Sequence, residues 1–321
     1  MFGNIVAIAI LVAIVVGLAL LTRRAWRAKR GAWLKWGGAI LAGLLTLVFA
    51  LVVFVAGKGL AAMYIPTSEP APNLKVEGTP EQVARGKYIA YIGCAGCHGT
   101  KEEFPLAGGF DLAADIPMPI GSLVSANLTP GGVLKDRTDG ELFRAIRHGY
   151  GKDGTVLALM SLMPYRQLSD DDTKALIAFL RSQPATQTQT LGGDNINLLG
   201  AILVGAGMFP APDPVNKNPI TAPAKGVNPE YGKYVATFGE CRGCHGPNLT
   251  GTPASAAGDA IPDPRPIVST WSRDQFVQTM RSGVKPTGQA FPQGMPWKNA
   301  SRMDDTDLAA LYEYIRSLAG K

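Results

Sequence analysis

Two long runs of apolar residues lie near the start of the chain. No charged residue occurs from Ile5 to Leu21 or from Trp36 to Gly57. With its flanks, each run is about 20 residues long, which is the length that a helix needs to cross ~30 Å of hydrocarbon. The pattern predicts a membrane anchor of two transmembrane helices within residues 1–64.

A short basic loop separates the two apolar runs. It contains six basic residues and three tryptophans: Arg23, Arg24, Arg27, Lys29, Arg30 and Lys35, with Trp26, Trp33 and Trp36. Short loops rich in Lys and Arg stay in the cytoplasm, and tryptophan favours the membrane interface. The loop therefore predicts a topology with both chain ends on the outer face of a bacterial cytoplasmic membrane. A patch for nucleic acid is one disfavoured alternative. A cleaved signal peptide is the other, because the start of the chain lacks the basic region and the Ala-x-Ala cleavage site of such peptides.

The charge of the chain is concentrated in this anchor. Residues 1–63 carry seven basic side chains and no acidic one, and the remainder carries 24 basic against 25 acidic. The soluble part is thus near neutral, so long-range steering toward a strongly charged partner is not expected.

After residue 79, apolar residues recur at the spacing of an α-helix. This part of the chain contains a sequence repeat, whose two copies cover residues 79–184 and 228–321. Each copy begins with a helix-start signal, Thr79-Pro80 or Asn228-Pro229. Amphipathic helices are expected from Thr138 to Gly149 and Ser272 to Gly283, and again from Asp171 to Ser182 and Asp304 to Ser317. The expected buried positions of the two final helices are Leu176, Phe179 and Leu180, and Leu311, Tyr314 and Ile315. Before the first of these amphipathic helices in each copy, Ile116-Pro117-Met118-Pro119 matches Ile261-Pro262-Asp263-Pro264.

Two linkers complete the domain plan, residues 65–78 and 185–227. The second contains an apolar segment, Ile196 to Phe209, of only 14 residues, which is too short to span a membrane. We expect this segment to pack between the two repeated domains; the alternative is that it rests on the bilayer surface.

Two copies of Cys-x-x-Cys-His use all four cysteines of the chain, Cys94, Cys97, Cys241 and Cys244, and are completed by His98 and His245. The spacing is typical of c-type haem attachment, with two thioethers to the porphyrin and the imidazole on the iron. A zinc ribbon places its halves ~15–20 residues apart, and disulfides need no adjoining histidine. The motifs therefore predict two covalently bound haem c groups.

Each repeat resembles a class I cytochrome c domain, and the first also carries Asn127-Leu128-Thr129-Pro130 and Met163-Pro164-Tyr165 of bacterial membrane-associated cytochromes c. The resemblance implies that both repeats are all-α class I cytochrome c domains. Together with the apolar runs, it predicts an all-α chain in which two N-terminal transmembrane helices are followed by these two domains. That group includes the cytochrome subunits of membrane dehydrogenases, which typically carry three haem motifs, whereas this chain carries two.

Met163 and Met295 are the candidates for the sixth iron ligands. They occupy equivalent positions, and proline follows each one and restricts it to extended backbone. A thioether ligand favours ferrous iron and suits electron transfer. Other methionines lack an equivalent in the second copy or are expected in the core: Met118, Met160 and Met303. His148 is expected to be a surface or helix-end residue and is kept as a reserve ligand.

These features favour a membrane-anchored electron carrier with its haem domains on the periplasmic face. It would connect a quinol-oxidising complex or dehydrogenase with an oxidase, a reaction centre or a soluble cytochrome, and could be a subunit of a larger membrane complex. A dihaem enzyme such as a peroxidase and the dihaem subunit of a haem–copper oxidase are the alternatives. Enzymatic activity stays open, and no catalytic residue is assigned.

Overall fold

The structure is a computed structural model that describes residues 2–29, 31–67, 69–101, 103–188, 190, 193–208, 215–254, 259–292 and 294–319. The predicted all-α class is confirmed, with 57% helix and 6% strand. Two short strands, β1 (Gly121–Val124) and β2 (Gly193–Ile196), pair in the only sheet of these residues. Arg30 of the basic loop and Phe209 of the apolar segment lie outside the described residues.

The chain divides into two compact units. The first consists of Met1–Pro66, Pro119–Ser122 and Asn195–Ala211, and the second of Thr67–Met118, Leu123–Asp194 and Pro212–Lys321. The predicted anchor therefore lies in the first unit. Both predicted repeats lie in the second unit, except for residues 119–122.

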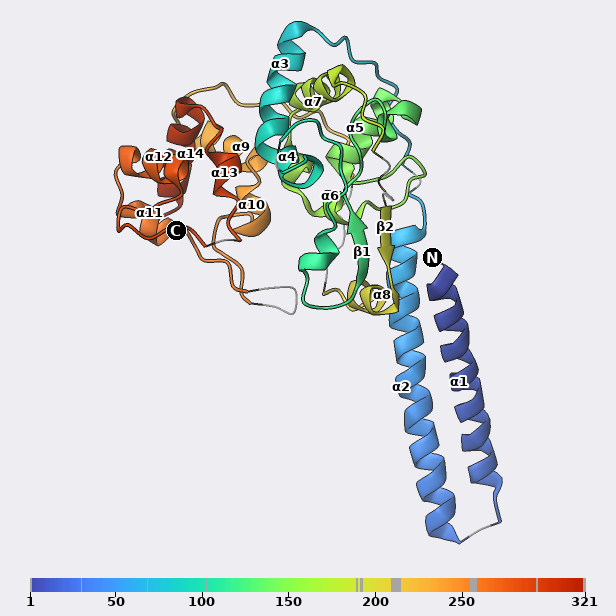
Figure 1. Ribbon diagram of the computed structural model, residues 1–321. Helices are drawn as coiled ribbons and strands as arrows, with labels where there is room; N and C mark the ends of the chain where they lie inside the picture. The colour runs from blue at the N-terminus through green and yellow to red at the C-terminus, as the bar shows by residue number, and fades with distance from the viewer. Residues whose placement is uncertain are drawn as a thin grey trace. The chain divides into compact units, whose positions relative to one another are not determined.

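Two long helices form most of the first unit, α1 (Phe2–Arg27) and α2 (Ala32–Tyr64), and they lie side by side (Figure 1). Both are long and apolar enough to cross a membrane. Large apolar side chains point outward along them, including Ile10, Leu47 and Phe54, each more than half exposed. A surface of this kind suits a lipid environment better than water.

The short helix α8 (Leu198–Gly205) packs against α2 within the first unit. The two helices approach so closely that a Cβ atom at Gly59 or Gly205 would lie 1.9 Å from a carbonyl oxygen of the other helix. The expectation that this apolar segment packs between the repeated domains is therefore wrong. Part of the segment is buried in the first unit instead, including Ile196, Ala201 and Leu203, a choice that the linker sequence alone leaves open.

In each repeat of the second unit, the first helix crosses the last one. The pairs are α3 (Pro80–Ile89) with α7 (Asp170–Ser182), and α9 (Pro229–Phe238) with α14 (Asp305–Leu318). A Cβ atom at Gly86 or Gly232 would lie 1.9 Å from a carbonyl oxygen of the crossing helix. Glycine therefore permits the same close crossing in both copies. The six predicted apolar positions of the two final helices are all buried.

Local signals fix the ends of the helices. The Thr79 side chain and Gln82 form a capping box at α3, and Asn228 caps α9. The helices α5 (Asp139–His148) and α12 (Arg273–Ser282) also begin with capping boxes, and both end at a glycine in left-handed conformation. Capping residues satisfy backbone N–H groups that have no partner within the helix, which makes such boundaries readable from sequence.

Shorter elements connect these helices. In the first repeat they are η1 (Ala90–Cys94), α4 (Ala95–His98), η2 (Leu112–Asp115), η3 (Val133–Asp136), α6 (Ala158–Leu162) and η4 (Pro164–Gln167). In the second repeat they are α10 (Cys241–Cys244), α11 (Arg265–Ser269) and α13 (Trp297–Ala300).

Reciprocal hydrogen bonds join the two repeats. Tyr88 of α3 donates its hydroxyl to Asp307 of α14 at 2.7 Å, and the equivalent Tyr234 of α9 donates to Asp172 of α7 at 2.6 Å. Each hydroxyl also accepts a backbone N–H at the N-cap of the same opposite helix. The two copies thus contact each other through matching positions, as the subunits of an isologous dimer do.

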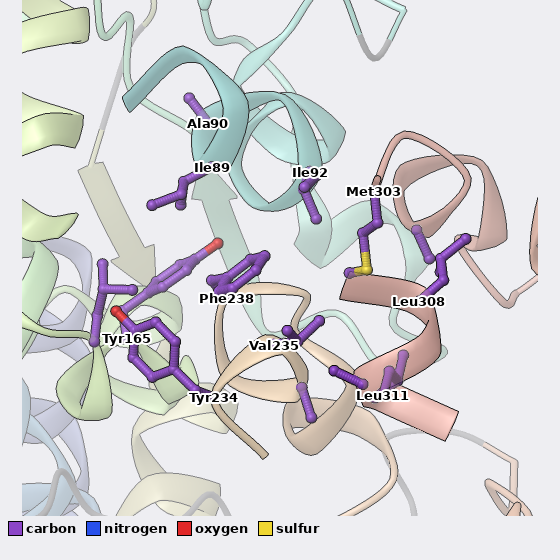
Figure 2. Packing of buried hydrophobic residues seen from close by; sticks show 14 of the residues in the cluster. Ile89, Ala90, Ile92, Tyr165, Tyr234, Val235, Phe238, Met303, Leu308 and Leu311 are labelled. Carbon is purple, nitrogen blue, oxygen red and sulfur yellow. The ribbon is translucent and has the colours of Figure 1, made fainter. Parts of the chain in front are cut away.

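One continuous core runs through both repeats. Ile89 and Ile92 of the first copy lie close to Phe238 and Val235 of the second, with Met303 beside them (Figure 2). Met303 is fully buried, as expected of a core methionine. The second unit therefore holds both Cys-x-x-Cys-His motifs in one packed body.

Candidate functional site

The first motif begins in a widened helical turn. Helix α3 continues directly into η1, a π-helical turn that ends at Cys94, and α4 then carries Cys97 and His98. Such turns insert a residue into a helix and are frequent at functional sites. Cys94 is half-buried and Cys97 is exposed.

The second motif begins with a break in the helix rather than a widened turn. Helix α9 ends at Phe238, and Glu240 adopts a left-handed conformation (φ 60°) before α10 carries Cys241 and Cys244. Counted from the matching glycines, Gly86 and Gly232, the second copy has one residue more before its first cysteine. As predicted, each motif follows the C-terminal end of a short capped helix.

Both motif histidines are held in the same way. The Nδ1 atom of His98 lies 2.8 Å from the carbonyl oxygen of Ala126, and that of His245 lies 2.8 Å from the carbonyl oxygen of Pro262. A carbonyl oxygen can only accept a hydrogen bond, so Nδ1 carries the proton and the lone pair remains on Nε2. Metal-binding histidines are commonly oriented by such a bond. Burial also lowers the pKa of His98, which favours the neutral form that binds metal.

These two hydrogen bonds correct one expected match between the repeats. Pro262 is the structural equivalent of Ala126 and not of Pro117, its partner in the sequence comparison. The chain needs 28 residues from His98 to its carbonyl partner but only 17 from His245. The longer segment of the first copy contains η2 and β1.

The four cysteines are free to bind haem. None forms a disulfide, and burial raises the pKa of the Cys94 and Cys241 thiols to about 12. Within the described ranges, no three His, Cys, Asp or Glu side chains converge as they would around a zinc ion. Free thiols on a helical turn, with a carbonyl-oriented histidine directly after them, fit covalent haem.

The two candidate methionines lie beside the shared core. Met163 has the extended backbone expected before proline (φ −70°, ψ 147°), and both Met163 and Met295 are partly buried against the shared core, as are Cys94 and Cys241. Their binding to iron stays a prediction.

His148 lies at the end of helix α5, as expected, but it is buried rather than exposed. Burial and the cations of Arg147 and Arg166 lower its pKa to about 4. The side chain is thus neutral near pH 7 and lies in a cationic environment.

Sequence reasoning missed the pair formed by Glu240 and Tyr165. The Tyr165 hydroxyl donates to the Glu240 carboxylate at 2.5 Å, across the two repeats. The additional residue before Cys241 was the available signal, because an insertion beside a binding motif in one of two repeats marks a position with its own role.

Comparisons with known proteins agree with this geometry. The profile of the family described as Cytochrome c matches residues 83–184 and 229–319, so each segment contains one motif. A nicotinate dehydrogenase subunit from Pseudomonas putida is 30% identical over 116 residues, which cover 31% of this chain and 10% of that protein.

Cytochrome c subunits of quinone-dependent alcohol dehydrogenases are also similar. The subunit from Gluconacetobacter polyoxogenes is 29% identical over 97 residues, 27% of this chain and 21% of that protein. The subunit from Gluconobacter oxydans is 25% identical over 96 residues, which cover 26% of this chain and 20% of that protein. The alignments thus span about a fifth or less of the length of these curated relatives. Because the family profile covers more than half of the chain, the protein belongs to the cytochrome c family, whose members carry covalently bound haem c and transfer electrons.

Proposed function

We propose that the protein is a membrane-anchored dihaem cytochrome that carries electrons from a quinol-oxidising complex or a dehydrogenase to a terminal acceptor. The observation that supports this most is the repeated hydrogen bond from His98 and His245 to backbone carbonyls. Two motif histidines that are oriented by the same kind of hydrogen bond within one compact unit suit two cofactors of one kind.

Cys94 and Cys97 would hold the first haem by thioether bonds, and Cys241 and Cys244 the second. His98 and His245 would offer Nε2 to the irons, with Met163 and Met295 as the opposite ligands. When bound, haem supplies one-electron chemistry between ferrous and ferric iron.

Each attachment motif lies close to a segment near the candidate methionine of the other repeat. A Cβ atom at Gly96 of the first motif would lie 2.8 Å from the Asn299 side chain, four residues after Met295. A Cβ atom at Gly243 of the second motif would lie 3.6 Å from Pro164, directly after Met163. Each motif therefore lies against the methionine loop of the other repeat, an arrangement that suits electron exchange inside the protein.

The partner is proposed from the relatives and from the first unit. Two relatives are named as cytochrome c subunits of quinone alcohol dehydrogenases, and the long helices α1 and α2 are suited to a membrane. A membrane dehydrogenase or quinol-oxidising complex is thus the proposed donor, and as its subunit the chain would be purified together with it. An oxidase, a reaction centre or a soluble cytochrome is the proposed acceptor.

Mass spectrometry of the purified chain tests the cofactor assignment. The intact mass should exceed 33.9 kDa by two haems, and a variant with Cys94 and Cys97 changed to Ala should lose one. The matched variant at Cys241 and Cys244 should lose the other. A protein with zinc and no haem would refute the proposal, and high-spin haem with rapid peroxide turnover would favour a peroxidase.

Reporter fusions test the membrane arrangement. A reporter that is active only after export should work when fused behind Lys58, and one that is active only in the cytoplasm should work near Lys29. The expectation rests on the basic loop between α1 and α2. The reverse pattern would place both motifs on the cytoplasmic side and contradict the periplasmic assignment.

A further inference from the structure

One carboxyl group lies at the junction of the two haem-attachment motifs. Glu240 directly precedes Cys241 of the second motif, and its carboxylate accepts the hydroxyl of Tyr165 from the first repeat at 2.5 Å. Tyr165 lies two residues after Met163, in η4. The hydrogen bond therefore joins the attachment turn of one repeat to the methionine loop of the other.

The first motif lies against Tyr165 and the end of α9. A Cβ atom at Gly93, the residue before Cys94, would lie 2.3 Å from the Tyr165 hydroxyl and 2.9 Å from the carbonyl oxygen of Phe238. Only glycine allows the first attachment turn to approach so closely. Glu240 and Tyr165 thus lie between the two turns that carry the cysteines.

Electrostatics agrees with this placement. The carboxylate of Glu240 raises the pKa of all four cysteine thiols in addition to the effect of burial, so its field reaches both motifs. Burial raises the pKa of Glu240 itself to about 7, and the hydrogen bond from Tyr165 opposes that rise.

The other groups around Glu240 are neutral or already bound. Tyr165 faces it from η4, Cys94 and Cys97 from the first motif, and Cys241 and Cys244 from α10. The nearby cation of α10, Arg242, donates to Gln167 and to the carbonyl oxygen of Pro247. Haem attachment converts the thiols to thioethers, so the carboxyl would remain the charge-bearing group between the motifs.

We infer that Glu240, held by Tyr165, tunes the reduction potentials of both haems together. The inference rests on the proposed dihaem function. A negative charge near iron stabilises the ferric state relative to the ferrous state, so an ionised Glu240 lowers both potentials. Because the carboxyl touches both repeats, the effect is shared rather than confined to the haem of its own motif.

Proton uptake accompanies electron uptake in this arrangement. When the donor protein delivers one electron, the added negative charge favours protonation of the Glu240 carboxylate by one proton from solvent. When the electron leaves for the acceptor, the proton returns to solvent. Both potentials should therefore fall as the pH rises through neutrality.

The test is a spectroelectrochemical titration of the full-length holoprotein in detergent, compared with the Glu240→Gln variant. Gln keeps the size of the side chain and an oxygen that accepts from Tyr165, but it carries no charge. Above neutral pH, both one-electron waves of the variant should lie at higher potential than those of the wild type. Below neutral pH the two proteins should converge, because the wild-type carboxyl is then protonated.

Two further variants separate tuning from a merely structural role. Tyr165→Phe removes the hydrogen bond that lowers the Glu240 pKa, so the pH-dependent part of both waves should move to higher pH. Glu230→Gln removes an exposed carboxylate from α9, the helix that precedes Glu240 in the chain, and should change neither wave.

The outcomes distinguish this inference from the proposed function. A shift of only one wave, or of none, in Glu240→Gln would overturn the shared role while two haems remain. A protein without two one-electron waves would instead refute the dihaem proposal itself.

Discussion

A methionine before a proline is one residue-scale feature that both repeats share beyond the haem motifs. Proline disfavours helical backbone for the residue before it, and Met163 is accordingly extended, with ψ of 147°. The peptide backbone thereby projects the thioether from a fixed position rather than from a flexible loop. Such rigidity suits a ligand that must stay on iron in both oxidation states.

Replacing these methionines should remove a specific spectroscopic signal. Oxidised His/Met haem shows weak near-infrared absorption from sulfur to iron, and Met163→Ala or Met295→Ala should each remove about half of it and lower one haem potential. Met303→Leu is the control, because Met303 is fully buried in the core and should leave the band intact. An unchanged band in Met163→Ala would assign the sixth ligand to another residue.

His148 should make stability depend on pH. Its pKa is lowered from 6.5 to about 4 in the folded protein, mainly by burial and then by Arg147. Between these values the unfolded chain binds a proton that the folded chain does not, so the free energy of unfolding should decrease as the pH falls through this window.

Urea denaturation of the full-length protein at about pH 7 and about pH 5 would measure this dependence. In His148→Asn the loss of stability between the two values should be smaller than in the wild type. An identical loss in both proteins would show that other groups cause the pH dependence.

At the scale of the elements, a crossing of two helices organises each repeat. Helix α3 crosses α7, and α9 crosses α14, with a glycine at each point of closest approach. The final helices bury an apolar stripe at the crossing and begin with acidic residues that favour the helix N-terminus. Local sequence thus forms each helix, and the glycine determines how closely the pair can pack.

Adding a methyl group at this crossing should be strongly destabilising. In Gly86→Ala or Gly232→Ala the new Cβ atom would lie 1.9 Å from backbone oxygen, so the helices must separate, at a cost of about 3 kcal/mol or more. Thermal denaturation and haem content would measure the effect. Gly57→Ala is the control, since nothing lies within 4 Å of that position. Equal stability of Gly86→Ala and Gly57→Ala would contradict the packing described here.

At the scale of the whole molecule, the described chain consists of two compact units with different surfaces. The helices of the first unit expose apolar side chains, whereas the second unit has a continuous core that both repeats share. The reciprocal bonds of Tyr88 and Tyr234 make the second unit an internal dimer. Each tyrosine completes the N-terminus of a helix in the other repeat, so the two copies stabilise each other.

Removing either tyrosine hydroxyl should weaken the whole second unit. Tyr88→Phe and Tyr234→Phe each remove one donor to a buried carboxylate and the acceptor of an N-cap N–H group, and each should lower the free energy of unfolding by about 1–3 kcal/mol. Urea denaturation followed by haem absorption would measure the change. Tyr91→Phe is the matched control, because the Tyr91 hydroxyl bonds Glu103 at the exposed surface. A loss in Tyr234→Phe no larger than in Tyr91→Phe would mean that the reciprocal bonds contribute little.

The sequence by itself determined the features that depend on neighbouring residues. Apolar runs and caps predicted the helices, because capping groups and helical periodicity act within a few residues of each other. The Cys-x-x-Cys-His spacing predicted the attachment turns, because it is also a pattern of neighbouring residues. The repeat also predicted the buried stripe of each final helix, including Leu176 and Leu311.

Only the tertiary structure decided the contacts between segments far apart in the chain. The apolar segment that contains α8 could bury its residues on any apolar surface, and the close approach of Gly59 and Gly205 selected α2. The carbonyl partner of His98 differs from the one that sequence matching suggested, because loops of unequal length can reach the same position. The bond between Glu240 and Tyr165 joins residues 75 positions apart, and no local propensity encodes such a distance.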